Sequence, residues 1–257
     1  MNIFEDLKAG ALLFDGAMGT YFASLHDDPL ARCEPANLSD PVLIRRIHEE
    51  YLAAGCRAIK TNTFAANTFT LHLPFGQVRE IIEAGWRLAS GAAAPHEAYV
   101  FADIGPVAGA QEHGIDEEYR RIADVFLALG ARYFLFETFA TDRDLPAAVR
   151  YIKERCPEAF ILTSFAVSPD GFTEEGVSGA ALLHRMQENP NVDAVGINCM
   201  SGPYHLKRYL ETLKGIHKPL SVMPNAGYPT VIGSRTYFGN NADYFGREMA
   251  DIVRGGA

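Results

Sequence analysis

The segment Ala194-Val195-Gly196-Ile197-Asn198-Cys199 is a short apolar run that ends in an amide and a thiol. Its apolar residues do not alternate with polar ones, which is typical of a parallel strand buried on both faces. Six other segments have the same form, and a polar residue ends or follows each of them. They span residues 12–14, 58–60, 99–102, 133–136, 160–164 and 220–223. The sequence therefore predicts seven buried strands.

Amphipathic helical patterns lie between these strands. Asp40 and Pro41 provide an N-cap and a proline in the first turn of one helix. Asp116 and Ser178 are predicted to cap two more. Further helices are predicted over residues 144–152 and 206–213. Strands that alternate with helices indicate a parallel α/β fold with right-handed crossovers.

The spacing of the strands favours a closed barrel. From Leu12 to Leu220 the strands follow one another at about 35 residues per step, which suits a (β/α)8 TIM barrel. At that spacing an eighth strand falls near residue ~255. We therefore expect one α/β domain, a TIM barrel over residues 1–257, with its eighth strand and helix missing from this chain.

Composition excludes several classes of function. The net charge is −9 and no run of Lys or Arg occurs, so nucleic acid and anionic membranes are not expected as partners. No signal peptide or membrane-spanning run is present, so a cytoplasmic location is expected. The cysteines show no paired spacing and are expected to be free thiols or metal ligands. They are Cys33, Cys56, Cys156 and Cys199.

Polar residues gather where the predicted strands end, and in a closed barrel this is where the active site lies. Single residues have structural explanations: Asp15 before Gly16 suits a turn, and Asn62 and Asn225 can satisfy loop backbone groups. Glu137 follows an apolar run, and a buried carboxylate needs a partner or a role. Polar residues occur at the ends of all seven predicted strands, which favours a functional site on this rim of the barrel.

Cys199 is placed like a metal ligand or a nucleophile, although a lone buried cysteine is usually a small hydrophobic residue. A zinc site with one open position needs three protein ligands. The chain offers one plausible thiolate, and its histidines form no HxxxH or HxH pattern. The other three cysteines lie in a loop, at a helix end and before Pro157, which are poor positions for joint coordination.

Five motifs resemble the homocysteine S-methyltransferase family in order and spacing. They are DGAMGT (15–20), TNTF (61–64), ET (137–138), GINC (196–199) and PNAG (224–227). Residues 198–205 are similar to the branch fused to a methylenetetrahydrofolate reductase domain. The resemblance covers essentially the whole chain. It implies a (β/α)8 barrel that transfers a methyl group to the sulfur of homocysteine to give methionine.

The resemblance also implies a zinc ion held by three cysteines. Cys199 matches the ligand on the sixth strand, and the other two come from a Gly-Gly-Cys-Cys-Gly block expected beyond Ala257. Zinc binding lowers the pKa of a substrate thiol, so that the nucleophilic thiolate forms without a strong base. We therefore expect this chain, as it stands, to bind zinc poorly and to be inactive.

By the same resemblance, Asp15 and Glu137 face the ammonium of homocysteine, and backbone amides of residues 18–20 hold its carboxylate. Asn62 and Asn225 are expected to line the pocket, and Asn198 to support the metal ligand. The candidate substrate-binding residues are Asp15, Gly16, Ala17, Met18, Gly19, Thr20, Asn62, Glu137, Asn198 and Asn225. The methyl donor stays open, because methylcobalamin, a methylated folate, S-methylmethionine and betaine all serve within the family.

Two other functions fit the same pattern. A metal-free barrel that binds an amino acid or acts as a scaffold would explain the single zinc-site cysteine. An unrelated TIM-barrel lyase would use Asp103, Glu137 and a metal that prefers oxygen ligands, and would be nearly indifferent to mutation of Cys199.

Overall fold

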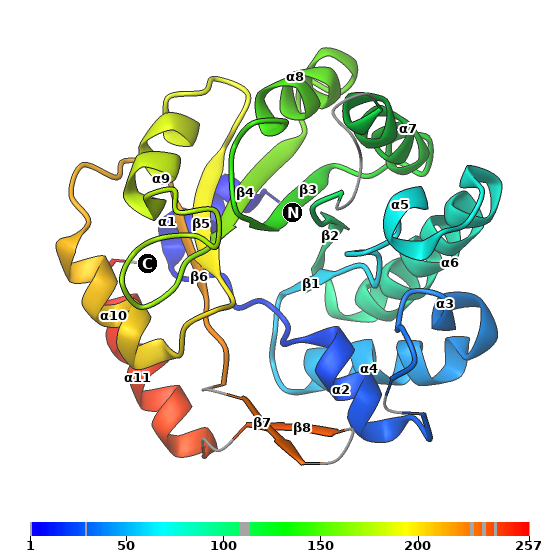
Figure 1. Ribbon diagram of the computed structural model, residues 1–257, viewed down its shortest axis with the longest axis horizontal. Coiled ribbons are helices and arrows are strands. Elements are labelled where there is room, and N and C mark those ends of the chain that lie inside the picture. Colours follow the sequence, from blue (N-terminus) through cyan, green and yellow to red (C-terminus); the bar gives the residue numbers. More distant parts are fainter. Residues whose placement is uncertain are drawn as a thin grey trace. The chain divides into compact units, whose positions relative to one another are not determined.

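The computed structural model describes residues 2–28, 30–107, 114–226, 229–232, 235–238 and 241–256. The chain divides into two compact units. The first comprises Met1–Leu135 and Ala147–Ala159, and the second Phe136–Pro146 and Phe160–Ala257. Strands alternate with helices along both units, as Figure 1 shows. The predicted α/β class is therefore confirmed.

The strands form one six-stranded and one two-stranded sheet. They are β1 (Ala58–Lys60), β2 (Tyr99–Ile104), β3 (Tyr133–Phe139), β4 (Phe160–Ala166), β5 (Ala194–Asn198), β6 (Leu220–Met223), β7 (Pro229–Ile232) and β8 (Arg235–Phe238). In the first unit the order is β1-β2-β3, where only the start of β3 belongs to that unit. In the second unit the order is β3-β4-β5-β6, and β7 pairs with β8 antiparallel.

The helices follow the strands along the chain. They are α1 (Ile3–Ala9), α2 (Met18–Leu25), α3 (Ala36–Ser39), α4 (Pro41–Ala53), α5 (Thr68–Leu71), α6 (Phe75–Ala93), the 3-10 helix η1 (Ala94–His96), α7 (Ile115–Ala128), α8 (Leu145–Arg155), α9 (Gly179–Gln187), α10 (Pro203–Thr212) and α11 (Ala242–Arg254).

Six of the seven predicted strands are present. Neighbouring strands pair in parallel, with Ala58 opposite Tyr99 in the first unit and Val195 opposite Leu220 in the second. Residues 12–14 form no strand, so that prediction was wrong. They contribute one parallel bridge, between Phe14 and Ala58. Leu13 is 59% exposed, so this segment lacks the two buried faces that its apolar residues suggested.

Three strands run further than their apolar residues suggested. β2, β3 and β4 continue to Ile104, Phe139 and Ala166. Asp103 and Glu137 therefore lie within strands and not after them. The backbone N–H of Asp103 donates to the hydroxyl of Thr61 at 3.0 Å, which ties this part of β2 to the residue that follows β1.

The predicted helix starts were right in two cases and wrong in one. Asp40 caps α4 and Ser178 caps α9 through their side chains. Asp116 does not cap α7, which begins at Ile115 after Gly114. Asp116 lies instead in the first turn, where a negative charge favours the positive end of the helix dipole.

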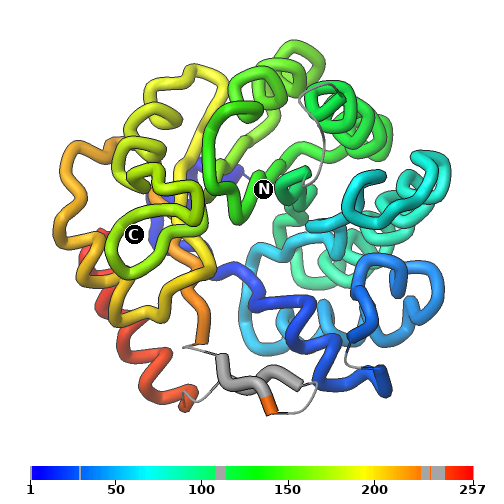
Figure 2. Tube along the Cα trace, in the orientation of Figure 1, coloured from blue at the N-terminus to red at the C-terminus, as the bar shows by residue number. Residues whose placement is uncertain are grey.

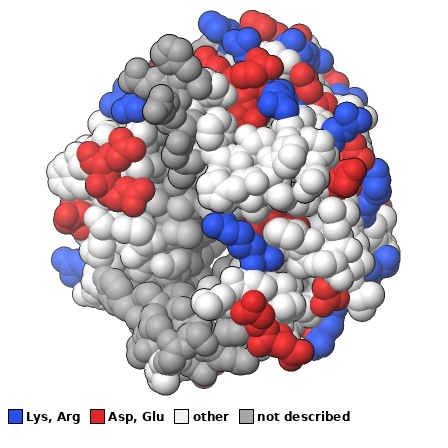
Figure 3. All heavy atoms as spheres, turned by 45° about the vertical axis from the view of Figure 1, so that its right-hand side comes forward, with Lys and Arg blue, Asp and Glu red and all other residues white. Residues whose placement is uncertain are grey.

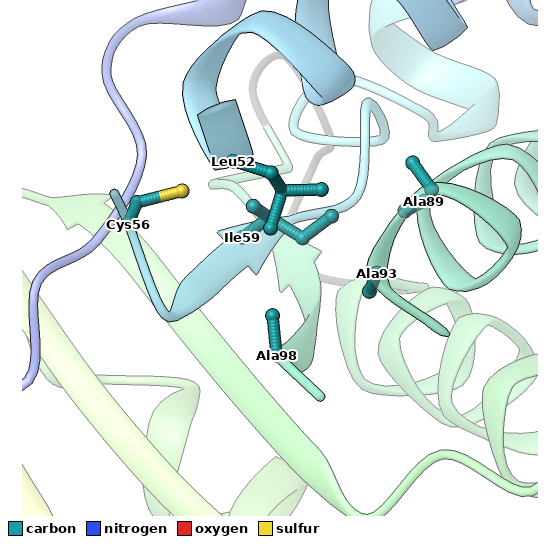
Figure 4. Packing of buried hydrophobic residues seen from close by; sticks show 7 residues of the cluster. Leu52, Cys56, Ile59, Ala89, Ala93 and Ala98 are labelled. Carbon is teal, nitrogen blue, oxygen red and sulfur yellow. The ribbon is translucent and has the colours of Figure 1, made fainter. Parts of the chain in front are cut away.

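The core of the first unit includes a cluster between α4, β1 and α6 (Figure 4). Leu52 of α4 and Ile59 of β1 pack against small residues of α6, among them Ala89 and Ala93. Small side chains on α6 let the helix lie close to the strand. The sequence analysis did not predict this 19-residue helix, although its apolar residues recur at helical spacing.

In the second unit, β4 is buried along its whole length and β5 likewise. Helix α9 packs on these two strands. Helices α10 and α11 lie side by side, as Figure 2 shows. Lys207 of α10 forms ion pairs with Glu248 and Asp251 of α11, which links the two helices.

The surface of the described residues carries charges of both signs. Exposed pairs one helical turn apart, such as Arg45–Glu49 on α4, recur along the helices. On the face shown in Figure 3, acidic and basic side chains are interspersed. Within the described part of the chain, no helix has the length and apolar character that a membrane crossing requires.

Candidate active site

The turn from Asp15 into α2 lies beside the end of β1 in the first unit. The Asp15 N–H donates to the carbonyl of Ala58 at 2.9 Å, and its Oδ2 accepts from the N–H of Lys60 at 3.1 Å. Helix α2 begins at Met18, and no side chain caps its N-terminus. The amides of its first turn therefore face out of the helix without a side-chain acceptor.

Tyr51 of α4 supports this turn. Its hydroxyl donates to the carbonyl of Ala17 at 3.0 Å. A Cβ atom at Gly16 would lie only 2.7 Å from the same hydroxyl, so only glycine fits there. Burial raises the pKa of Tyr51 to about 12; the charge of Asp15 acts in the same direction and that of Lys60 opposes it. The ring is therefore a neutral hydrogen-bond donor at physiological pH.

Lys60 belongs to the same cluster, and the sequence reasoning missed it. It is the last residue of β1, and its side chain is only 13% exposed. Its Nζ lies 4.0 Å from Oδ1 of Asp15, whose side chain is 2% exposed. The available signal was a lysine that closes an apolar strand, since a lysine is rarely buried without a charged partner.

Asn62 is buried in the first unit and ties loops together. Its Nδ2 donates to the carbonyl of Cys33 at 2.6 Å and to Oδ1 of Asn37 at 2.8 Å. Asn37 in turn donates to the carbonyls of Asn62 and Ile81. The amide nitrogen of Asn62 therefore holds the loop that precedes α3.

All four cysteines are free, as the sequence predicted. Burial, followed by the charge of Glu34, raises the pKa of Cys33 far above its usual range. Burial also raises the pKa of Cys56 to about 12. Cys156 is buried and accepts a hydrogen bond from Arg132 at 3.0 Å. Cys33 and Cys56 are therefore protonated at neutral pH, a poor state for a metal ligand.

Asn198 organises the candidate residues of the second unit. Its Oδ1 accepts from the N–H of Thr138 at 3.0 Å and from the hydroxyl of Ser164 at 2.8 Å. Its Nδ2 donates to the hydroxyl of Thr138 at 2.7 Å and to Sγ of Cys199 at 3.4 Å. Because the Thr138 hydroxyl already accepts from Asn198, its own hydrogen can point to Cys199 Sγ, 3.8 Å away.

The backbone around this network adopts an uncommon conformation. Thr138, Cys199 and Met200 have φ values of 66°, 56° and 55°. Non-glycine residues rarely occupy this left-handed region, and such strain gathers at functional sites. Cys199 follows directly on β5, and the left-handed turn directs the chain away from the strand at this residue. The strain and the hydrogen bonds together define the position of Sγ.

Asn225 and Glu137 belong to the second unit as well. The N–H of Asn225 donates to the carbonyl of Ser201 at 3.0 Å, and that of Cys199 donates to the carbonyl of Met223 at 3.0 Å. Glu137 is half-buried in β3, immediately before Thr138. The structure thus brings Asn198, Cys199 and Asn225 together. Gly227, the last residue of the fifth motif, lies outside the described residues.

The residues described do not complete a metal site. No group of three or more His, Cys, Asp or Glu side chains arranged to hold an ion occurs among them. Cys199 has an amide and a hydroxyl beside its sulfur, and neither is a typical zinc ligand. These residues alone therefore do not fit a zinc ion.

Comparison with known proteins places the chain in a family. A family model described as homocysteine S-methyltransferase matches residues 12–256. The chain belongs to this family. The resemblance predicted from the five motifs is therefore confirmed.

Curated relatives and solved structures agree with the family. The chain is 30% identical to methionine synthase of Mycobacterium leprae over 91% of its own length, but spans about a fifth of that protein, 21%. It is 25% identical to homocysteine S-methyltransferase YbgG of Bacillus subtilis, covering 84% of this chain and 78% of the relative. The metallated homocysteine methyltransferase MmuM of Escherichia coli has the same fold, with a TM-score of 0.70 at 20% identity over 88% of each chain.

Proposed function

We propose that this homocysteine S-methyltransferase family member binds homocysteine and, as part of its full gene product, transfers a methyl group to the homocysteine sulfur to give methionine. The observation that carries the proposal is the network in which Asn198 binds Thr138, Ser164 and Cys199. It fixes one thiol, on a strained turn, in a chain whose family acts on a thiol substrate.

The amino-acid end of homocysteine is proposed to bind through charges and amides. Asp15 and Glu137 bind the ammonium, and the amides of the first turn of α2 bind the carboxylate. Support comes from the uncapped N-terminus of α2, because such an N-terminus attracts anions. Charge-assisted hydrogen bonds of this kind are short and orient the ligand.

The remaining candidates are proposed to shape the site. Gly16 admits the ring of Tyr51 and so fixes the turn that carries Ala17. Asn62 holds its loop, and Asn225 supports the turn after Cys199 through Ser201. We propose that residues 1–257 form one domain.

Zinc enters the proposal through Cys199. Bound zinc would supply Lewis acidity that lowers the pKa of the substrate thiol. Because the described residues offer no set of three ligands, the ion would need ligands from elsewhere. We propose that the 257-residue chain alone binds zinc poorly and is inactive; elemental analysis that finds one tightly bound zinc per chain would contradict this.

The methyl donor is left open among methylcobalamin, a methylated folate, S-methylmethionine and betaine. The chain spans about a fifth of the two mycobacterial methionine synthases that it matches. We therefore propose one of these four donors, and any domain that carries the donor is proposed as well.

The proposal is tested with Cys199→Ser in the full-length gene product. Methionine formed from homocysteine is measured by mass spectrometry with each of the four donors. We expect the wild type to form methionine with one donor and the variant to lose this activity. Cys156→Ser is the matched control, because a serine hydroxyl can still accept from Arg132.

Two outcomes would reject the proposal. Equal methionine formation by Cys199→Ser and the wild type would remove the role of the thiol. Binding of homocysteine with no methionine from any donor would favour the metal-free amino-acid-binding barrel instead.

A further inference from the structure

Lys60 places a positive charge beside Asp15 in a nearly buried position. Its side chain is 13% exposed at the C-terminal end of β1, and its Nζ lies 4.0 Å from Oδ1 of Asp15. The backbone N–H of Lys60 also donates to Oδ2 of the same carboxylate. The two side chains therefore form a pair of opposite charges whose relative position is fixed through the main chain of β1.

This pair matches the charges of an α-amino acid. Such a molecule carries an ammonium and a carboxylate on one carbon atom, and the protein presents a carboxylate and an ammonium side by side. The Nζ–Oδ1 distance exceeds that of a charge-assisted hydrogen bond, about 2.7–2.9 Å. An ammonium has three donors, so Lys60 can bind a second carboxylate while it stays beside Asp15.

We propose that Lys60 binds the carboxylate of the amino-acid substrate while Asp15 binds its ammonium. This inference rests on the proposed function, since it names a further residue for the same substrate. It adds a side-chain charge to the backbone amides of α2. It also gives Lys60 a role that none of the five family motifs contains.

Charge balance explains why such a pair selects amino acids. A zwitterionic ligand is neutral as a whole, so its binding adds no net charge to a nearly buried place. A thiol that lacks the carboxylate or the ammonium brings a net charge there, which is costly. The pair therefore discriminates against simple thiols as well as attracting the substrate.

The surroundings of the pair are suited to this role. Tyr51 lies close enough for the charges of Asp15 and Lys60 to act on its pKa in opposite directions. Its hydroxyl is bound to the carbonyl of Ala17, at the start of α2. The charge of Asp15 also acts on Cys56, whose raised pKa keeps it neutral. Tyr51 and Cys56 are thus neutral neighbours of Asp15.

The test compares three ligands by isothermal titration calorimetry on the full-length gene product with zinc in the buffer. They are L-homocysteine, 3-mercaptopropylamine, which lacks the carboxylate, and 4-mercaptobutanoate, which lacks the ammonium. We expect Lys60→Met to weaken L-homocysteine on the order of tenfold to a hundredfold and not to weaken 3-mercaptopropylamine. Asp15→Asn should weaken L-homocysteine and spare 4-mercaptobutanoate.

Two further variants serve as controls. Lys60→Arg keeps the charge and should retain most of the affinity that Lys60→Met loses. Lys8→Met removes a lysine whose side chain is 73% exposed, and should bind all three ligands like the wild type. Circular dichroism of each variant checks that it is folded.

The outcomes separate this inference from the proposed function. If the wild type binds none of the ligands, the proposed function fails. If the wild type binds L-homocysteine and Lys60→Met does so equally well, or loses 3-mercaptopropylamine to the same extent, Lys60 does not bind the carboxylate and the inference is overturned.

Discussion

Asn198 and Thr138 bind each other twice, once through each end of the Asn198 amide. The Oδ1 atom accepts from the backbone N–H of Thr138, and the Nδ2 group donates to its hydroxyl. The residues are 60 positions apart in sequence, on β5 and β3. This pair of hydrogen bonds defines the orientation of the amide, so the nitrogen faces the Thr138 hydroxyl and Cys199 Sγ, and the oxygen faces Ser164.

Removing this amide should destabilise the second unit. Asn198→Ala leaves the buried hydroxyl of Ser164 and the N–H of Thr138 without their acceptor, at a cost of about 2 to 3 kcal/mol. Urea unfolding measures this loss. Asn191→Ala, at a side chain for which no hydrogen bond is described, should change the free energy of unfolding by less than about 0.5 kcal/mol. Equal losses in the two variants would show that the network contributes nothing.

Met200 should tolerate glycine better than other surface residues do. Its φ of 55° is costly for a side chain, and it is 44% exposed, so Met200→Gly should raise the free energy of unfolding by about 0.5 to 1 kcal/mol. Glu188→Gly places glycine at a φ of −78° on an exposed residue, and should lower stability by about the same amount. Chemical denaturation measures the free energy of unfolding of both variants. If both are destabilised alike, the prediction for Met200 is wrong.

Gly16 should not accept even a methyl group. In Gly16→Ala the new Cβ meets the Tyr51 ring at 2.7 to 2.9 Å, so the ring or the turn must move, which costs about 1 to 3 kcal/mol. The bond from Tyr51 to Ala17 should weaken as well, and with it the affinity for homocysteine. Gly10→Ala is the control, since no atom lies within 4 Å of the added group. Thermal unfolding that finds Gly16→Ala as stable as this control would refute the clash.

His48 should make the fold sensitive to acid. It is fully buried in α4, neither ring nitrogen has a hydrogen-bond partner among the described residues, and burial lowers its pKa to about 4 from the usual 6.5. The unfolded state binds the proton more tightly than the folded state does. The contribution of neutral His48 to the free energy of unfolding is therefore fully present above pH 6.5 and is lost as the pH falls towards 4, by about 2 kcal/mol at pH 5.

The measurement is the free energy of unfolding in urea at pH 7.5 and pH 5. His48→Leu should lose clearly less stability between these values than the wild type does. His96→Leu, at an exposed position, should keep the pH dependence of the wild type. An unchanged pH dependence in His48→Leu would show that another group carries the effect.

The strands were predictable where both of their faces are buried. β4 and β5 consist of buried residues only, and their apolar runs predicted them well. Residues 12–14 look the same in sequence, yet Leu13 is exposed and the segment forms only a bridge. The antiparallel pair β7–β8 was not predicted, because the search looked for buried parallel strands and passed over the short β-branched and aromatic segments on either side of Gly233-Ser234.

The site was predictable only in part, because sequence reasoning searched the residues after each strand. That search found Asn198 and Cys199, which do end and follow β5. It did not assign a role to Thr138 or Ser164, whose contacts with Asn198 depend on the three-dimensional pairing of strands. It passed over Lys60, which lies inside β1 and whose partner Asp15 is 45 residues away. The cytoplasmic location stays a prediction, and the sequence does not name the methyl donor.

The four thiols have different surroundings, so we expect them to react with an alkylating reagent at different rates. Cys56 and Cys156 are buried, and Cys33 is held in its protonated form, so an alkylating reagent at neutral pH meets resistance at all three. Cys199 is half-buried on its turn, with two hydrogen-bond donors beside its sulfur. Iodoacetamide should therefore mark this position first, and peptide mass spectrometry then reports whether a ligand shields it.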